Sequence, residues 1–292
     1  MRTDGWHLTE DLDGFLTRTG DFLRSRPALH TVALTVTDAL RRRGLHLYGE
    51  EAPRFGWLAD PDGAVRAVLF RTPPHPLHIT PVTEEEADAL AARLLALGHD
   101  LTGVSAERET AEAFTAAWQR RTGNRGELRR RQRLYRLGDL TVPEPVPDGR
   151  ARVAGPADRE LLIRWYGEFA EAAGQGVIQE AGAWADARVA HGGITLWETP
   201  DGKPVAMAGA TPEVAGQVRV APVYTPAHLR GRGYAGAVTA DVSRAALEAG
   251  AEVLLFTDLA NPTSNGLYRR IGYRPVADFA VYGFGAGAGA GS

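Results

Sequence analysis

The sequence predicts an α+β fold built from two similar halves. Three observations predict it: a length of 292 residues, a proline-rich segment near the midpoint, and the same order of strands and helices on either side of that segment. The length is enough for roughly two domains of ordinary size. With 44% hydrophobic and 24% charged residues, the composition is that of a globular protein.

The boundary between the halves lies at residues 140–149, which include Pro143, Pro145 and Pro147. Each proline removes a backbone donor and holds the preceding residue in an extended conformation. We therefore predict a stiff linker at 140–149, between a domain of residues 1–139 and a domain of residues 150–284. The tail at 285–292 is almost entirely glycine and alanine, and we predict that it is flexible.

The first half opens with two predicted helices and continues with a hairpin that turns at Pro61-Asp62-Gly63. Thr83 is a suitable N-cap for a later helix, and Glu84 to Glu86 complement the positive end of that helix's dipole. The predicted elements are helices 12–24 and 31–43, strands 54–60, 64–72 and 77–80, helix 84–97, strand 101–105 and helix 109–121.

The second half repeats this order, with a hairpin that turns at Pro200-Asp201-Gly202. Its predicted elements are helices 158–173 and 181–191, strands 193–198, 204–211 and 218–225, helix 233–249, strand 253–258 and helix 263–271. Six elements in the same order indicate a tandem duplication. The alternative is two unrelated α+β halves.

Composition excludes several function classes. A net charge of −3 argues against bulk electrostatic binding of nucleic acid or anionic lipid. The absence of cysteine excludes disulfides, thiolate metal sites and cysteine nucleophiles. The chain has no run of about 18 apolar residues and no apolar signal core near its start, so we predict a cytoplasmic protein without a membrane partner. Arginine replaces lysine almost everywhere, which we attribute to a bacterial genome of high GC content.

A glycine-rich segment, residues 223–236, joins a predicted strand to a predicted helix. Gly231, Gly233 and Gly236 allow close backbone approach to a ligand, and the first N–H groups of a helix point outward without partners. Such a turn favours a phosphate or pyrophosphate. A dinucleotide-binding Gly-x-Gly-x-x-Gly turn, with Asp258 at the end of the next strand, is the competing interpretation. Against it, the preceding strand follows a hairpin.

A second segment, Asn261 to Tyr273, follows the strand that ends at Asp258. Asn261 suits the N-cap of a helix that starts at Pro262, and Gly272 is a natural terminator. This structural explanation covers most of the segment, but it does not require Tyr268.

The two segments together resemble the GNAT superfamily of coenzyme-A-dependent N-acyltransferases. Arg230-Gly231-Arg232-Gly233-Tyr234-Ala235 is similar to that family's Arg/Gln-x-x-Gly-x-Gly/Ala loop, and Asn261 to Tyr273 is similar to its Asn-x-x-Ser-x-x-Leu-Tyr-x-x-x-Gly-Phe/Tyr segment. The resemblance covers about 151–284. It implies two GNAT-like domains, each a mixed, mostly antiparallel twisted sheet flanked by helices, with a degenerate N-terminal copy.

The resemblance also implies site residues and a co-substrate, acetyl-CoA, without a metal. Tyr268 would donate a proton to the departing thiolate, and the amide of Val223 would polarise the thioester carbonyl. The residues implied in coenzyme binding are Val223, Tyr224 and Thr225 beside the pantetheine arm, Arg230, Gly231, Arg232, Gly233, Tyr234, Ala235 and Gly236 around the pyrophosphate, and Asn261 and Ser264 along the cofactor arm.

A base must take the proton of the attacking amine, and the sequence does not name it. Glu168 and Glu171 are candidates because they lie on the predicted helix 158–173, which borders the acceptor cleft in the family. Such acids are more commonly solvated surface groups. Trp165 and Trp184 are candidate lining residues of an acceptor pocket, although tryptophan at helical spacing is more often core.

The first half lacks these features. Thr80-Pro81-Val82-Thr83 stands in place of the glycine loop, and Glu84 to Glu86 would repel a pyrophosphate. No tyrosine acid follows. This half would therefore shape the acceptor cleft or stabilise the fold.

Two further features carry weaker signals. Five arginines between Arg129 and Arg136 could bind RNA or phosphate, although such a run is more often the wet face of an edge strand. His75 and His78 are the only close histidine pair, and we predict no metal site.

We therefore predict transfer of an acetyl group from coenzyme A to a primary amine of a small molecule or peptide. Direct attack in a ternary complex fits a chain without cysteine. The alternatives are an aminoacyl-tRNA- or carrier-dependent transferase and a non-catalytic sensor of acyl-CoA. The acceptor and the oligomeric state stay open.

Overall fold

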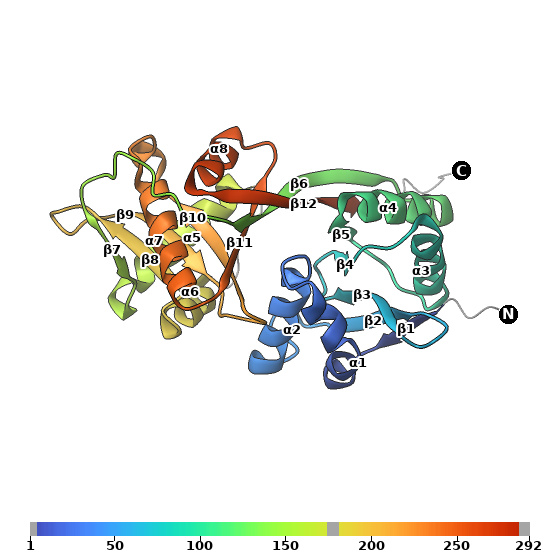
Figure 1. Cartoon of the computed structure of the whole chain (residues 1–292). Coiled ribbons are helices and arrows are strands. Elements are labelled where there is room, and N and C mark those ends of the chain that lie inside the picture. The colour runs from blue at the N-terminus through green and yellow to red at the C-terminus, as the bar shows by residue number, and fades with distance from the viewer. Residues whose placement is uncertain (1–4, 174–180, 286–292) are drawn as a thin grey trace. The chain divides into compact units, whose positions relative to one another are not determined.

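The computed structural model describes residues 5–173 and 181–285 (Figure 1). The chain forms two compact units. The first comprises Met1–Leu134, Asp258–Ala260 and Val276–Ser292, and the second comprises Tyr135–Thr257 and Asn261–Pro275. The segment at 140–149 thus belongs to the second unit, and residues 276–284 group with the first. Of the tail that we predicted to be flexible, residues 286–292 lie outside the described part of the chain.

In the first unit, a mostly antiparallel sheet runs in the order β1-β2-β3-β4-β5 and continues with the C-terminal half of β12. Strands β4 and β5 are parallel, and the other neighbours are antiparallel. Residues Phe279 to Gly283 of β12 pair with β5. The strands are β1 (Trp6–Thr9), β2 (Arg54–Ala59), β3 (Val65–Arg71), β4 (Leu77–Ile79), β5 (Gly103–Glu107) and β12 (Tyr273–Phe284).

The core of the first unit lies between its strands and helices, around Leu90, Phe114 and Trp118. The helices are α1 (Leu12–Ser25), α2 (Thr31–Arg43), α3 (Glu84–Ala96) and α4 (Arg108–Thr122). Helix α3 begins with a complete capping box. The Thr83 side chain accepts from the Glu86 amide, and the Glu86 carboxylate accepts from the Thr83 amide. The expected N-cap at Thr83 is confirmed.

In the second unit the strand order is β11-β10-β9-β8-β7, in which β10 and β11 are parallel and the other neighbours are antiparallel. The strands are β7 (Arg150–Val153), β8 (Ile194–Glu198), β9 (Pro204–Ala210), β10 (Gln217–Tyr224) and β11 (Glu252–Asp258), and the helices are α5 (Arg159–Ala172), α6 (Ala181–Ala190), α7 (Tyr234–Glu248) and α8 (Pro262–Ile271). Short 3₁₀ turns occupy Pro156–Asp158 and Ala227–Leu229.

The predicted fold class is confirmed, since both units combine a mixed, mostly antiparallel sheet with helices in the same order. The edge strands β1 and β7, of four residues each, were not predicted from the sequence. The expectation of an edge strand around Arg129–Arg136 was wrong. Strand β6 (Gly126–Leu137) has neighbours, since Leu259 N donates to Arg131 O at 2.9 Å and Arg133 forms a two-pronged ion pair with Asp278 of β12.

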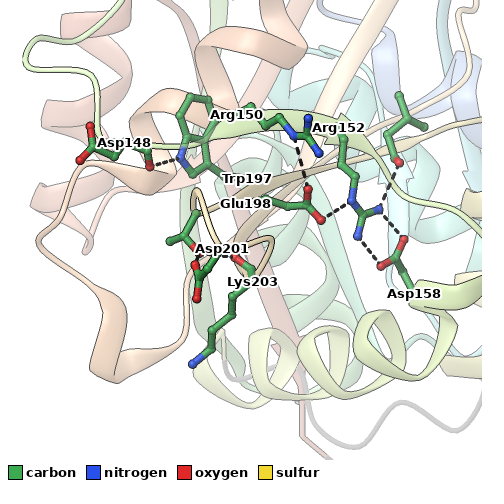
Figure 2. Close-up of polar contacts among 10 residues, drawn as sticks. Asp148, Arg150, Arg152, Asp158, Trp197, Glu198, Asp201 and Lys203 are labelled. Atoms are coloured by element: carbon green, nitrogen blue, oxygen red, sulfur yellow. Dashed lines mark hydrogen bonds and ion pairs between the residues drawn. The ribbon is translucent and has the colours of Figure 1, made fainter.

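The proline segment, which we define as residues 140–149, forms hydrogen bonds with the rest of the second unit. Thr141 N donates to Ile271 O at the end of α8 (2.8 Å), and Trp197 Nε1 donates to Asp148 O (3.3 Å, Figure 2). Leu140 packs against the hydrophobic core of this unit. The segment is therefore a covering element of the second unit.

A partly buried ion-pair network holds β7 at the sheet edge, as Figure 2 shows. Arg152 donates to both carboxylate oxygens of Asp158 at 2.6 and 2.7 Å and pairs with Glu198 of β8. The bond from Arg152, together with the Gly155 amide, holds the pKa of Asp158 below its usual value, although burial acts in the opposite direction. This network joins β7, β8 and the turn before α5.

Candidate functional site

The carboxyl end of β10 is separated from β11. The parallel pairing of these strands covers only Gln217 to Arg219 of β10. On its other side, β10 carries a bulge against β9, because Val220 lies opposite Ala210 while Val223 lies opposite Ala208. A bulge bends the strand that carries it. Among the described residues, the backbone around Val223 is therefore not paired with β11.

The loop after β10 ends in an uncapped helix. Gly231 and Gly233 have φ values of 77° and 84°, which favour glycine. Gly233 is the N-cap of α7 and supplies no side-chain cap. Because the first amides of a helix lack intrahelical partners, this end can hold an anion. The first unit differs, since the matching helix α3 is capped by Thr83 and Glu86 of its own chain.

Two arginines of this loop are exposed and are tied to its backbone. Arg230 Nε donates to Thr225 O at 3.1 Å, and Arg232 Nη2 donates to His228 O at 3.4 Å. Both guanidinium groups therefore add positive charge beside the uncapped start of α7.

The proline segment packs against this loop. A Cβ placed on Gly236 would lie 3.2 Å from Leu267 Cδ1 and 3.3 Å from Pro143 Cγ, and one on Gly233 would lie 3.5 Å from Pro147 Cδ. Gly236 thus permits a close approach between α7, α8 and the segment. These prolines were predicted only to form a linker, because proline spacing carries no information on what the segment covers.

Helix α8 is anchored by its own first turn. Asn261 is the N-cap of α8. Its side chain accepts a hydrogen bond from Ser264 N at 3.0 Å. One turn further, Asn265 accepts a hydrogen bond from the buried Tyr135 hydroxyl at 3.0 Å. These contacts fix the position of Tyr268.

Tyr268 is buried, with 8% of its surface exposed, in the core of the second unit beside Tyr273. Val223 and Tyr234 pack against the same core cluster. Burial raises the pKa of Tyr268 to about 12, so its phenol keeps its proton at neutral pH. Within the described residues, its hydroxyl has no hydrogen-bond partner. Tyr268 is therefore a protonated donor in the core of the second unit.

Thr225 presents a second unused polar group at the start of the loop. Its hydroxyl is buried and has no hydrogen-bond partner in the part of the chain that is described. A buried hydroxyl without a partner is costly. A ligand with a polar group at this point would remove that cost.

Glu168 of α5 meets the end of β10. The Tyr224 hydroxyl donates to Glu168 Oε2 at 2.6 Å. Burial raises the pKa of Tyr224 to about 12, and the bond and charge of Glu168 act in the same direction. Glu171, the other candidate base, is exposed in the last turn of α5. Tyr224 was predicted only as a coenzyme-binding residue, and its contact with Glu168 was not predicted, since no local signal links residues 56 positions apart.

The two candidate tryptophans differ in their surroundings. Trp165 is buried at 4% exposure, and its ring centroid lies 6.1 Å from that of Tyr224. Trp184 is half-buried and stacks on Tyr166 at 3.8 Å, with the Arg188 guanidinium 5.8 Å from its ring centroid. Trp165 is thus a core residue next to the end of β10, while Trp184 belongs to an aromatic pair that joins α5 and α6.

The remaining sequence features are the histidine pair and the arginine run. Among the described residues, no group of three or more His, Asp or Glu side chains is arranged to hold a metal ion. In the arginine run, Arg129, Arg133 and Arg136 each form an ion pair with a carboxylate. No helix in the described ranges is long and apolar enough to cross a membrane.

The chain is similar to one protein family and to several solved structures. Residues 207–280, which contain β10, the glycine loop and α8, match the family described as FR47-like protein. A GCN5-related N-acetyltransferase from Sphaerobacter thermophilus superposes with a TM-score of 0.63 at 18% identity, covering 97% of this chain and 96% of that one. The chain therefore has the fold of GNAT N-acetyltransferases.

Two further structures share this GNAT fold over nearly the whole chain. A GNAT-family acetyltransferase from Colwellia psychrerythraea gives a TM-score of 0.60 at 10% identity and covers 96% of this chain and 99% of that one. A tandem GNAT protein from the clavulanic acid biosynthesis pathway gives 0.55 at 12% identity and covers 98% and 100%. No curated protein matches the chain by sequence.

Proposed function

We propose that the second unit transfers an acetyl group from coenzyme A to a primary amine. One observation carries the proposal: the uncapped start of α7 follows a β10 end that is separated from β11. An anion-binding helix start beside an open strand end suits a long ligand with a phosphate at one end and an amide-bearing arm. The fold shared with N-acetyltransferases supports it.

The residues present fit coenzyme A. The amides from Arg230 to Gly236 would hold its pyrophosphate, with the charges of Arg230 and Arg232 alongside. The open backbone of Val223 to Thr225 would pair with the pantetheine arm, and the Thr225 hydroxyl, which has no partner among the described residues, would be able to bond to that arm. Asn261 and Ser264 would line the arm from α8. When bound, the thioester supplies an acyl group that an amine can attack.

Three groups of the chain would then act on the reaction. The Val223 amide would donate to the oxygen that develops negative charge. Tyr268 would donate its proton to the departing sulfur, and its pKa of about 12 ensures that it holds this proton at neutral pH. Glu168, oriented by the Tyr224 hydroxyl, would accept the proton of the amine, directly or through a water molecule. Glu171 is the second candidate for this role.

The experiment is calorimetric titration of the full chain with acetyl-CoA. Wild type binds, and Gly233→Glu abolishes binding, because the variant places a carboxylate at the helix start and a Cβ near Pro147. Gly250→Glu is the matched control. Gly250 has a φ of 85° against 84° for Gly233, so the two substitutions are equally strained, and it follows the other end of α7.

Binding that survives Gly233→Glu would place the coenzyme elsewhere. Wild type that fails to bind acetyl-CoA would refute the proposal and favour a carrier-dependent donor. Acetyl-CoA binding without turnover of any amine would favour a sensor.

A further inference from the structure

The first unit contains a cavity of about 470 Å³ that the proposed acyl transfer does not use. It lies between the end of β1, the start of β2, strand β3 and the C-terminal end of α3. Four buried leucines form its apolar floor: Leu69, Leu77, Leu94 and Leu101. The cavity is therefore at the C-terminal end of α3. The capped start of α3, which corresponds to the glycine loop of the second unit, is at the opposite end of the helix. Binding cavities of small ligands commonly span 300–1,000 Å³.

Most polar groups at the rim already have partners. Arg54 forms an ion pair with Glu10 at 2.7 Å, and the Thr9 hydroxyl accepts from Asp11 N at 3.0 Å. The last carbonyls of α3 accept from the amides of Leu97, Gly98 and His99. These polar groups therefore do not need a ligand to complete their hydrogen bonds.

Arg71 is the exception. Its Nη1 donates to Asp100 O at 2.6 Å, which fixes the guanidinium, while its Nε is buried without an acceptor within the described residues. Burial lowers the pKa of Arg71, and the carboxylates of Glu51 and Asp100 compensate only in part. This cation would gain from a further negative charge.

Apart from Glu51 and Asp100, the groups near Arg71 are a histidine and a carboxylate that is already paired. Burial, Arg54 and Arg71 lower the pKa of His99 against the opposing effect of Glu10, so this imidazole is neutral at pH 7. The carboxylate of Glu10 is engaged with Arg54.

We propose that this cavity binds a small amphipathic carboxylic acid. Its carboxylate pairs with the guanidinium of Arg71, whose planar fork matches a carboxylate, and its aliphatic chain lies on the four leucines. An amine of the same length would meet Arg54 and Arg71 with like charge, and a neutral amide would leave the charge of Arg71 uncompensated.

The test is calorimetric titration of the full chain with octanoate, octanamide and octylammonium, which share one chain length. Octanoate binds, octanamide binds at least tenfold more weakly, and octylammonium does not bind. Arg71→Gln lowers the octanoate affinity at least tenfold. Arg43→Gln, which removes an exposed arginine of α2 outside the cavity, leaves it unchanged.

A second variant protects the test against misfolding of Arg71→Gln. Leu97 is 48% exposed at the rim, so Leu97→Trp can fill the mouth without disturbing the core, and it should abolish octanoate binding. Equal affinity for octanoate and octanamide would overturn the proposal, as would unchanged affinity in Leu97→Trp. Titration with octanoate uses no coenzyme, so its outcome is independent of the acetyl-CoA experiment.

Discussion

At the scale of residues, Tyr268 and Glu168 are held in place by burial and by a single hydrogen bond, respectively. Tyr268 is enclosed in a core cluster, and its pKa of about 12 follows from that enclosure. Glu168 sits at a strand end and accepts a bond from a phenol that is itself hard to ionise. Tyr268 thus holds its proton firmly, and the carboxylate of Glu168 is oriented by the Tyr224 hydroxyl.

Tyr268→Phe should lower kcat by about 10²- to 10⁴-fold, the usual contribution of a positioned acid, while acetyl-CoA affinity changes little. Steady-state kinetics together with calorimetry measures both quantities. Tyr273→Phe is the control, since it removes a neighbouring buried phenol that bonds Ser243 at 2.7 Å. It should cost about 1 kcal/mol of stability and leave kcat unchanged. Unchanged turnover in Tyr268→Phe would refute the assigned role.

Glu168→Gln should lower kcat by about 10²-fold at neutral pH, because the amide cannot accept the amine's proton. Activity should return in part at high pH, where the acceptor amine is already deprotonated. Glu171→Gln tests the exposed alternative in the same assay. A larger loss in Glu171→Gln than in Glu168→Gln would move the base to Glu171.

At the scale of elements, helices α3 and α7 occupy equivalent places in the two units but have different N-terminal ends. Both follow a strand and precede a parallel strand. The start of α3 is closed by Thr83 and Glu86, whereas the start of α7 has glycine at its N-cap and no side-chain bond. A closed helix start stabilises the fold, and an open one is available to an anion.

Thr83→Ala should lower the free energy of unfolding by about 1 kcal/mol, because it removes the side-chain half of the capping box. Urea denaturation followed by circular dichroism measures it. Glu85→Ala changes the same first turn at a residue outside the capping box and is the control. Equal losses in both variants would contradict a specific role of the cap.

At the scale of the whole molecule, the C-terminal strand contributes residues to both units, although the proline segment predicted a boundary between two halves of the sequence. Strand β12 starts in the second unit, and from Val276 onward it belongs to the first, where it pairs with β5 over Phe279 to Gly283. The first unit therefore depends on residues at the far end of the chain.

Truncation after Pro275 should destabilise the first unit, since β5 loses an antiparallel partner over five paired residues. Thermal unfolding by circular dichroism should show a lower Tm. Removal of 286–292 alone is the control and should leave Tm unchanged, in line with the predicted flexible tail. An unchanged Tm after the longer truncation would show that β12 contributes little to that unit.

The sequence by itself determined the features that depend on near neighbours. The cap at Thr83, the glycine turn before α7 and the order of strands and helices follow from short-range patterns, because caps, turns and periodic burial involve residues a few positions apart. The fold class followed from that order, and the resemblance that pointed to Tyr268 rested on two local motifs.

Only the tertiary structure decided which distant groups meet. The bond between Tyr224 and Glu168, the packing of Pro143 beside Gly236 and the assignment of β12 to two units all join residues far apart in the chain. The cavity that Arg71 lines is likewise assembled from separate strands and a helix end. Such contacts are set by how whole elements pack, and that packing leaves no local pattern in the sequence.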